Sequence, residues 1–312
     1  MTLAVVFPGQ GSQSIGMLAA LAVEEPVVRQ TFDEASAVLG YDLWQLAERG
    51  PAELLNSTER TQPAMLTAGV AVFRAWRGRG APDPAVLAGH SLGEFTALVC
   101  AEAIGFADAV AVVQFRGRVM QEAMPVGQGA MAAILGLDDA AVEAACQEAA
   151  AGEVVEAVNY NSPGQIVIAG HAGAVVRAVE AAKLRGAKRA MLLAVSVPAH
   201  SSLLIPAGER LRERLAGIEI RAPRWPVYAV GLKHHDSPTA IREQVVAQLS
   251  SPVRWSDTVR DMLAHGVTHL VECGPGKVLT ALNRRIDKNK AIAMQAIDDP
   301  VSLAAALTKG NA

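Results

Sequence analysis

Runs of consecutive apolar residues alternate along the chain with longer segments whose apolar residues recur every three or four positions. Residues 3–7 (LAVVF) and 85–88 (AVLA) contain no polar position, which is typical of strands buried on both faces. Residues 63–79 show helical spacing and begin at Pro63, a residue suited to a first helical turn. A second helix is predicted from about residue 107 to 124. This alternation predicts the α/β fold class, with a mostly parallel sheet that carries helices on both faces.

The order of the predicted elements changes between residues 127 and 197. This stretch has the pattern of strand, helix, strand, strand, helix and strand, and its last strand is predicted at 189–197 (RAMLLAVSV). The βαββαβ order is typical of a ferredoxin-like module. Because the module starts and ends inside the larger fold, we predict a catalytic core formed by residues 1–126 and 198–312, with 127–197 as an inserted subdomain.

Charged residues of both signs are interspersed along the chain. The formal net charge of the 312 residues is −3, and no basic arm or acidic tail is present, so we expect no nucleic-acid partner. The apolar run at the N-terminus is too short to span a membrane and lacks a basic leader, so we expect no membrane association. The three cysteines are widely spaced, which predicts free thiols and a reducing, cytoplasmic location.

Residues 89–93 fit the pattern G-x-S-x-G, with Ser91 at its centre. The apolar run before them predicts a strand, and the residues after them predict a helix, which is the context in which this pattern marks a nucleophile. The two glycines allow a tight turn that lifts the serine hydroxyl above the sheet, close to a helix N-terminus. We therefore favour Ser91 as a nucleophile over a serine in an ordinary turn.

A serine hydroxyl needs an adjacent base at neutral pH, and the chain offers seven histidines. His234 and His235 lie together in the polar stretch KHHDSP, and we expect both to be solvated. The side chain of His90 should point away from its neighbour Ser91. His200 follows an apolar strand and a proline, where a residue at the mouth of a sheet would lie. Position alone leaves His200 open as either the base or a capping residue.

Arg116 lies in the middle of an apolar helical stripe, whereas Arg118 points to the opposite, polar side. A buried arginine needs an anion nearby, because an unpaired buried charge is costly. The residues alone leave two partners open. One is a structural aspartate or glutamate, and the other is a substrate carboxylate held bidentately by the guanidinium.

Seven segments match, together and in order, the motifs of one family. On these motifs, which cover nearly the whole chain, it resembles the malonyl-CoA:acyl-carrier-protein transacylase family of fatty acid synthesis. The combination is far more specific than any single motif. The segments are FPGQGSQ (7–13), TQPAML (61–66), GHSLGE (89–94), QFRGRVMQEAMP (114–125), NYNSPGQIVIAG (159–170), VSVPAH (195–200) and VECGPGKVL (271–279).

The resemblance implies an α/β-hydrolase-like core with an inserted ferredoxin-like subdomain, which is the layout predicted from the order of strands and helices. It also implies roles for individual residues. Ser91 matches the acylated nucleophile, and His200 matches its base. Arg116 matches the arginine that pairs with the malonyl carboxylate, and Gln62 matches a glutamine that lines the same site.

In similar enzymes the oxyanion hole consists of the backbone N–H groups at the positions of Gln10 and Leu92. The family lacks the carboxylate of the usual triad, and the backbone carbonyl at the position of Gln248 orients the histidine instead. The implied reaction is ping-pong: the malonyl group passes from malonyl-CoA to Ser91 and then to the phosphopantetheine thiol of an acyl carrier protein. It requires no metal or other cofactor.

Two groups of basic residues are candidates for docking the carrier protein, although each could equally be an ordinary solvated charge. One group lies in the predicted subdomain and the other on a late helix. They are Lys183, Arg185, Lys188 and Arg189, and Arg284, Arg285 and Lys288.

One stretch departs from the family pattern. Residues 229–235 (AVGLKHH) stand where related enzymes commonly carry an Asn-Asn-Val-type sequence, which puts in doubt any polar contact of those asparagines. Two other functions remain to be weighed. A serine thioesterase or hydrolase acting on acyl-CoA would share the turn around Ser91, and a non-catalytic subunit could bind the carrier protein with this fold.

Overall fold

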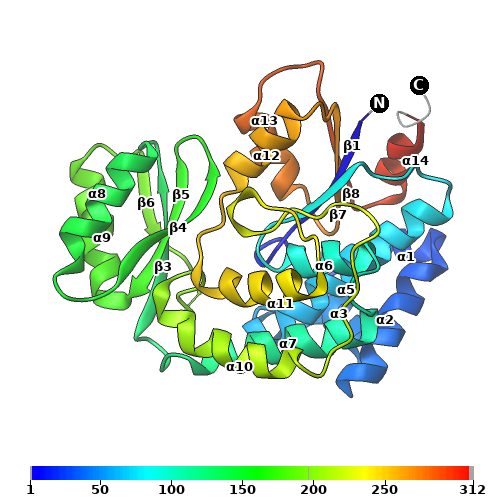
Figure 1. Cartoon of the computed structure of the whole chain (residues 1–312), viewed down its shortest axis with the longest axis horizontal. Helices are drawn as coiled ribbons and strands as arrows, with labels where there is room; N and C mark the ends of the chain where they lie inside the picture. Colours follow the sequence, from blue (N-terminus) through cyan, green and yellow to red (C-terminus); the bar gives the residue numbers. More distant parts are fainter. Residues whose placement is uncertain (1, 196, 309–312) are drawn as a thin grey trace.

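A parallel sheet and an antiparallel sheet organise the chain, and they lie in different parts of the molecule (Figure 1). The computed structural model describes residues 2–195 and 197–308. The parallel sheet has the strand order β2-β1-β7-β8, and every neighbouring pair is parallel, which confirms the sheet predicted from the apolar runs. Its strands are β1 Leu3–Phe7, β2 Val86–Gly89, β7 His269–Cys273 and β8 Ala293–Ile297.

Alternate side chains of β1 enter two separate cores, because successive residues of a strand point to opposite faces. Leu3, Val5 and Phe7 belong to one core, and Ala4 and Val6 belong to the other. Helices cover both faces of the sheet, as predicted. The second core is closed by α12 Trp255–Ala264 and α13 Val278–Ile286. The first core takes side chains from α1 Ala19–Glu24, α2 Pro26–Leu39, α3 Leu43–Arg49, α4 Ala52–Leu55, α5 Thr58–Gly78, α6 Gly93–Cys100, α7 Phe106–Glu122, α10 Ile205–Leu215, α11 Pro238–Ala247 and α14 Pro300–Thr308.

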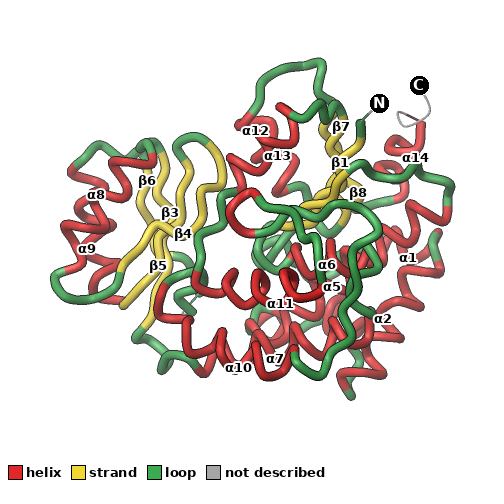
Figure 2. The backbone as a smooth tube through the Cα atoms, in the orientation of Figure 1, coloured by secondary structure: helices red, strands yellow, loops and turns green. Residues whose placement is uncertain are grey.

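The antiparallel sheet has the strand order β4-β5-β3-β6 and carries two helices on its outer face (Figure 2). Counted from the first strand of this unit, the order is 2-3-1-4, with the chain running βαββαβ. This arrangement confirms the ferredoxin-like prediction. The elements are β3 Gly129–Leu135, α8 Asp139–Ala150, β4 Val155–Ser162, β5 Gln165–His171, α9 Ala172–Leu184 and β6 Arg189–Leu192.

The inner face of the antiparallel sheet is directed toward the rest of the chain. Met131 of β3 and Val167 of β5 pack there with Leu193 and Val195, which follow β6 on the way back to the parallel sheet. Three short 3₁₀ turns complete the remaining connections. They are η1 Ser202–Leu204, η2 Val230–Leu232 and η3 Gln248–Ser250.

Two predicted elements have different bounds in the structure. Helix α5 begins at Thr58, five residues before Pro63, because the backbone N–H of Thr61 donates to the carbonyl oxygen of Ser57 at 2.8 Å and forms an earlier first turn, to which the Thr61 hydroxyl also bonds. Pro63 therefore lies inside the helix. Strand β6 ends at Leu192 rather than at 197, and residue 196 of the predicted run lies outside the described residues.

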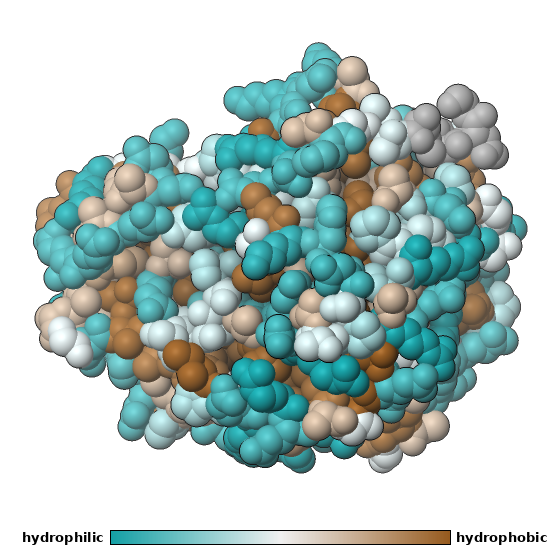
Figure 3. Space-filling model, viewed as in Figure 1, coloured by the Kyte–Doolittle hydropathy of each residue, from teal (hydrophilic) through white to brown (hydrophobic). Residues whose placement is uncertain are grey.

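Strands β3–β6 and helices α8 and α9 all lie within the stretch predicted as a subdomain, but the boundaries at 126/127 and 197/198 stay predictions. Residues 309–312 of the predicted core lie outside the described residues. Hydrophilic side chains cover most of the face shown in Figure 3, with hydrophobic ones in scattered patches. In the part of the chain that the structure describes, no helix combines the length and the apolar character needed to cross a membrane.

Candidate active site

Ser91 lies on the tight turn between β2 and α6, and its backbone φ is 53°. This left-handed conformation is strained for a residue with a side chain. The flanking glycines are required by close packing: a Cβ on Gly89 would lie 1.9 Å from the carbonyl carbon of Gly93, and one on Gly93 would lie 2.1 Å from the carbonyl oxygen of Phe7. The predicted strand–turn–helix context of Ser91 is therefore present.

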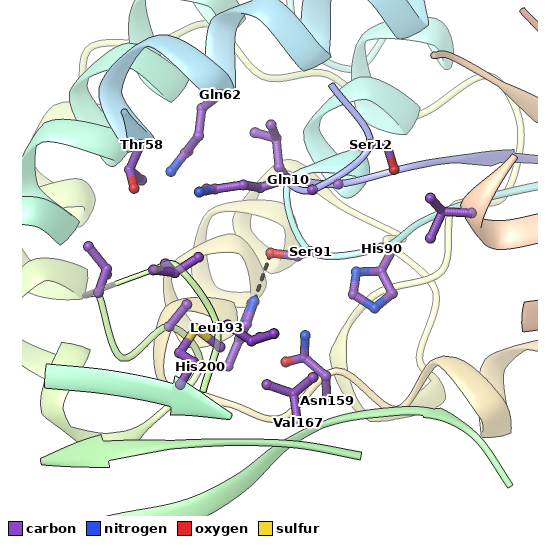
Figure 4. Close-up of a pocket in the computed structure, with 18 of the residues that line it drawn as sticks. Gln10, Ser12, Thr58, Gln62, His90, Ser91, Asn159, Val167, Leu193 and His200 are labelled. Atoms are coloured by element: carbon purple, nitrogen blue, oxygen red, sulfur yellow. Dashed lines mark hydrogen bonds between the residues drawn. The ribbon is translucent and has the colours of Figure 1, made fainter. Parts of the chain in front are cut away.

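The Ser91 hydroxyl oxygen lies 2.7 Å from Nε2 of His200 (Figure 4). Nδ1 of the same ring lies 2.9 Å from the backbone carbonyl oxygen of Gln248. Because a carbonyl oxygen only accepts hydrogen bonds, Nδ1 carries the proton and Nε2 accepts from the serine hydroxyl. In this tautomer the imidazole can take the serine proton while Oγ attacks a carbonyl carbon.

Burial keeps the His200 imidazole neutral. The residue is 3% exposed, and this burial, together with the nearby positive charge of Arg116, lowers its pKa to about 3. The hydrogen bond to the Gln248 carbonyl acts in the opposite direction but does not outweigh burial. At neutral pH the ring is therefore uncharged and able to accept a proton.

The backbone of Gln10 and that of Leu92 lie on either side of the serine turn. The loop after β1 packs directly on the turn, since a Cβ on Gly9 would lie 2.5 Å from the carbonyl oxygen of His90. Leu92 is the N-cap residue of α6, where N–H groups have no acceptor within the helix. An oxyanion hole formed by the backbone N–H groups of Gln10 and Leu92 stays a prediction.

Arg116 is 1% exposed and lies on the buried face of α7, whereas Arg118 is exposed as expected. Nη1 of Arg116 donates to Oε1 of Gln62 and Nη2 donates to Oε1 of Gln248, each at 2.8 Å. Both acceptors are neutral amides, and the described residues bring no carboxylate within ion-pair distance of Arg116. The structural aspartate or glutamate that the sequence left open is therefore not its partner.

The Arg116 side chain is still a cation, and it has a hydrogen-bond donor that no described residue uses. Burial lowers its pKa to about 10, and the negative charge of Glu94 opposes this shift, so the group is protonated at neutral pH. Its Nε atom is buried and has no partner among the described residues. A substrate carboxylate could therefore supply the full negative charge that this arginine lacks.

A cavity of about 470 Å³ joins these groups, a size suited to a small-molecule substrate. Figure 4 shows Thr58 and Gln62 of α5 across the cavity from Asn159 and Val167 of the antiparallel sheet. All the predicted site residues except Gln248 line it, namely Gln10, Gln62, Ser91, Leu92, Arg116 and His200. Gln248 instead lines a second, small cavity together with Ser91.

The expectation that both histidines of KHHDSP are solvated is wrong for one of them. His234 is exposed, but His235 is 2% exposed and its Nε2 lies 2.7 Å from Oε1 of Glu94. The cause is a local fold of the loop: the backbone N–H of His235 donates to the carbonyl of Val227, and this contact turns the side chain inward. The polar composition of the segment gave no signal for this burial.

Glu94 and Asn161 are two further site residues to which the sequence analysis assigned no role. Glu94, which follows the serine motif directly, is 4% exposed and accepts from Nε2 of Gln248 at 2.5 Å. Asn161 lies on β4 with its Oδ1 2.8 Å from Nε2 of His90, whose ring points away from Ser91 as expected. Both residues lie within segments that match the family motifs, and this match was the one signal in the sequence that could have identified them.

Comparisons with known proteins bear on this geometry. The chain matches the family model of the acyl transferase domain over residues 4–298. It is 56% identical to the malonyl CoA-acyl carrier protein transacylase of Escherichia coli strain K12 over 305 residues, which are 97% of this chain and 98% of that protein. It is 43% identical to the protein of the same name from Bacillus subtilis strain 168 over 307 residues, 98% of this chain and 96% of that protein.

Solved structures give the same result. The malonyl CoA-acyl carrier protein transacylase from Coxiella burnetii has a TM-score of 0.97 at 46% identity, and the match covers 99% of this chain and 98% of that one. A chain from the complex of a type II PKS acyl-carrier protein with its malonyl-transacylase has a TM-score of 0.97 at 52% identity, covering 99% of this chain and all of that one. These likenesses confirm the resemblance and the fold class predicted from the sequence.

Proposed function

The chain belongs to the acyl transferase domain family, and on this premise we propose that it transfers a malonyl group from malonyl-CoA to the phosphopantetheine thiol of an acyl carrier protein. This acyltransferase reaction supplies malonyl units for fatty acid synthesis. One observation carries the proposal: the Ser91–His200 pair and the buried Arg116 cation line one cavity. A malonyl thioester presents one carbonyl to be attacked and one carboxylate to be held.

In the first half-reaction, Ser91 Oγ attacks the thioester carbonyl carbon while His200 Nε2 takes the hydroxyl proton. The tetrahedral oxyanion accepts hydrogen bonds from the backbone N–H groups of Gln10 and Leu92. When the carbonyl re-forms, the C–S bond breaks, and the proton on His200 passes to the departing sulfur of coenzyme A. Malonyl-Ser91 remains as an ester.

In the second half-reaction, the thiol of the carrier protein takes the place of coenzyme A. His200 removes the thiol proton as the sulfur attacks the ester carbonyl of malonyl-Ser91. Collapse of the second tetrahedral intermediate breaks the C–O bond and returns the proton to Ser91 Oγ. Throughout both steps, the Gln248 carbonyl keeps the His200 ring in the tautomer that makes Nε2 the acceptor.

Arg116 explains why a malonyl group is the substrate that this site favours. Arg116 lines the cavity that contains the reacting serine and is held there as a buried cation, 1% exposed. A malonyl carboxylate can complete the pairing of this cation bidentately, whereas an acetyl group offers it nothing.

We propose that this activity is cytoplasmic, because the cysteines are free thiols. Cys100, Cys146 and Cys273 are all free and buried, and they form no disulfide. Free thiols persist in reducing compartments, which is consistent with a cytoplasmic enzyme.

The test is acylation of the protein by malonyl-CoA, followed by mass spectrometry of the intact chain and of the peptide that contains Ser91. We expect one malonyl group on Ser91, which holo carrier protein then removes. Release of free malonate without transfer would identify a hydrolase, and absence of any adduct would identify a binding protein. A Ser12→Ala variant is the matched control, because Ser12 also lines the cavity and should not affect acylation.

A further inference from the structure

A buried chain of hydrogen bonds connects the loop at residues 229–235 to Arg116. Nε2 of His235 lies 2.7 Å from Oε1 of Glu94, and Oε2 of Glu94 accepts from Nε2 of Gln248 at 2.5 Å. Oε1 of Gln248 in turn accepts from Nη2 of Arg116 at 2.8 Å. All four side chains belong to residues that are at most 4% exposed.

We propose that His235 is a positioning residue for the malonyl carboxylate. It acts through Glu94 and Gln248 on the orientation of the Arg116 guanidinium. This inference rests on the proposed function, because it concerns how the same site discriminates between acyl groups. His235 itself does not line the cavity that holds the reacting groups.

The donors and acceptors along this chain of hydrogen bonds can be assigned in only one way. Arginine only donates hydrogen bonds and an ionised carboxylate only accepts them, so the Gln248 amide must turn its oxygen to Arg116 and its nitrogen to Glu94. A flipped amide would place two donors against each other on one side and two acceptors on the other. Glu94 therefore fixes the amide of Gln248, and the fixed amide holds one arm of the guanidinium.

His235 keeps Glu94 in place. A buried carboxylate is costly unless both oxygens are hydrogen-bonded, and His235 serves one oxygen while Gln248 serves the other. Without the His235 donor, Glu94 would rotate toward another donor. Rotation would take Oε2 of Glu94 away from Nε2 of Gln248, so that this nitrogen would keep only the Ser91 carbonyl oxygen, at 3.0 Å, as its acceptor. It would also displace the negative charge that supports the Arg116 cation.

The loop fold makes this contact specific to His235. The backbone of Tyr228 pairs with that of His234 in an antiparallel bridge, so that neighbouring side chains point to opposite sides. The His234 ring stacks edge-on against Tyr228 at 4.5 Å between centroids and remains exposed. A small cavity of about 30 Å³ lies between this loop and the back of the site, where Ser91, Glu94 and Gln248 line it.

Three variants test the proposal through the ratio of kcat/KM for malonyl-CoA to that for acetyl-CoA. In His235→Gln the side-chain nitrogen occupies roughly the place of Nε2 and can still donate to Glu94, whereas the shorter His235→Asn cannot reach it. We expect His235→Asn to lower the ratio about tenfold or more, mainly through KM for malonyl-CoA, because a buried hydrogen bond to a charge is lost. His235→Gln should retain most of the ratio, and His234→Asn, the matched control, should leave it unchanged.

Several outcomes would overturn the proposal. If His235→Asn lowered both acyl activities in parallel, the residue would be merely structural. Equal ratios in the Asn and Gln variants would exclude the donor role. If His235→Asn does not fold, the Glu94→Gln variant tests the proposal instead. It keeps the size of the side chain but offers one acceptor oxygen to the two donors, Nε2 of His235 and Nε2 of Gln248. An unchanged ratio in that variant rejects the proposal, whereas wild-type protein that fails to form malonyl-Ser91 rejects the proposed function instead.

Discussion

The Nδ1–H group of His200 donates to the backbone carbonyl oxygen of Gln248 at 2.9 Å. In a Ser-His-Asp triad this position is taken by a carboxylate, which both fixes the tautomer and stabilises the imidazolium that forms. A carbonyl oxygen fixes the tautomer equally well but has no full negative charge. With burial and the positive charge of Arg116 acting against protonation, the pKa of His200 falls to about 3.

This lowered pKa predicts an unusual pH profile. His200 acts as a base only when it is neutral, so kcat/KM for malonyl-CoA should stay level as the pH falls through the ordinary histidine value of about 6.5. The acid limb should appear only as the pH falls further toward 3. The measurement is kcat/KM between pH 5 and 8, and an acid limb centred near the ordinary value would disagree with the prediction.

Protein stability must be followed in the same experiment. Between the ordinary pKa and the lowered one, the unfolded chain binds a proton at His200 that the folded chain does not bind. The free energy of unfolding therefore decreases as the pH falls through this interval and is fully recovered above about pH 6.5. Circular dichroism at each pH separates loss of fold from loss of catalysis.

Ser91→Ala should lower the rate of malonyl transfer by at least about a thousandfold and leave the fold intact. The turn depends on the close packing of Gly89 and Gly93 rather than on the serine hydroxyl, and alanine accepts the same backbone conformation at similar cost. The measurements are the malonyl adduct by mass spectrometry and Tm by thermal unfolding. Wild-type turnover in Ser91→Ala would show that another group carries the acyl chain.

The sequence predicted those parts of the fold that depend on local patterns. The strand at Leu3–Phe7 was predictable because five consecutive apolar residues fit a strand buried on both faces. The start of α5 was missed because Pro63 marked a first turn, whereas backbone hydrogen bonds to the Ser57 carbonyl begin the helix earlier. Local patterns therefore predict which elements exist more reliably than where they begin.

The site was predictable only in part, for a related reason. The burial of Arg116 follows from its place in an apolar stripe, but its partners Gln62 and Gln248 come from two other elements. The burial of His235 depends on a backbone contact with Val227 within an irregular loop, and no periodicity marks it. Contacts between distant segments decide the first feature and the path of an irregular loop decides the second, and a single sequence displays neither.

The structure separates the two candidate docking groups for the carrier protein. In the subdomain group, Lys183 pairs with Glu180 and Arg185 pairs with Glu148, so part of their charge is compensated. On α13, Arg285 donates to Gln165, a residue that lines the active-site cavity. Positive charge in contact with a residue of the cavity lining is better placed to guide an acidic partner to the cavity.

Lys288, which was predicted on the same late helix as Arg284 and Arg285, lies beyond the end of α13 at Ile286. We therefore expect KM for the carrier protein to rise with salt and to depend more on Arg284 and Arg285 of α13 than on the subdomain group. Arg285→Glu should raise this KM about three- to tenfold at low salt, and the matched variant Arg185→Glu should change it less. Steady-state kinetics with holo carrier protein at several salt concentrations provide the comparison. A KM that is insensitive to salt would count against both groups, and a larger effect of Arg185→Glu would favour the subdomain.

The final prediction is that Arg116 controls the choice of acyl group more than the bond-making chemistry. Without its guanidinium, the amide oxygens of Gln62 and Gln248 would face the malonyl carboxylate and leave a buried charge unpaired. The cost of breaking a buried pair in this way is about 3–5 kcal/mol, so Arg116→Ala should lower kcat/KM for malonyl-CoA by roughly two to four orders of magnitude. Acetyl-CoA carries no carboxylate and should lose little. Arg116→Lys should restore only part of the malonyl activity, because an ammonium group cannot bond to both amides and a carboxylate in the planar geometry of a guanidinium. The quantity to compare is the malonyl-to-acetyl ratio of kcat/KM in the wild type and in both variants. An unchanged ratio in Arg116→Ala would mean that the arginine only joins α5, α7 and the Gln248 turn, and that selectivity arises elsewhere in the cavity.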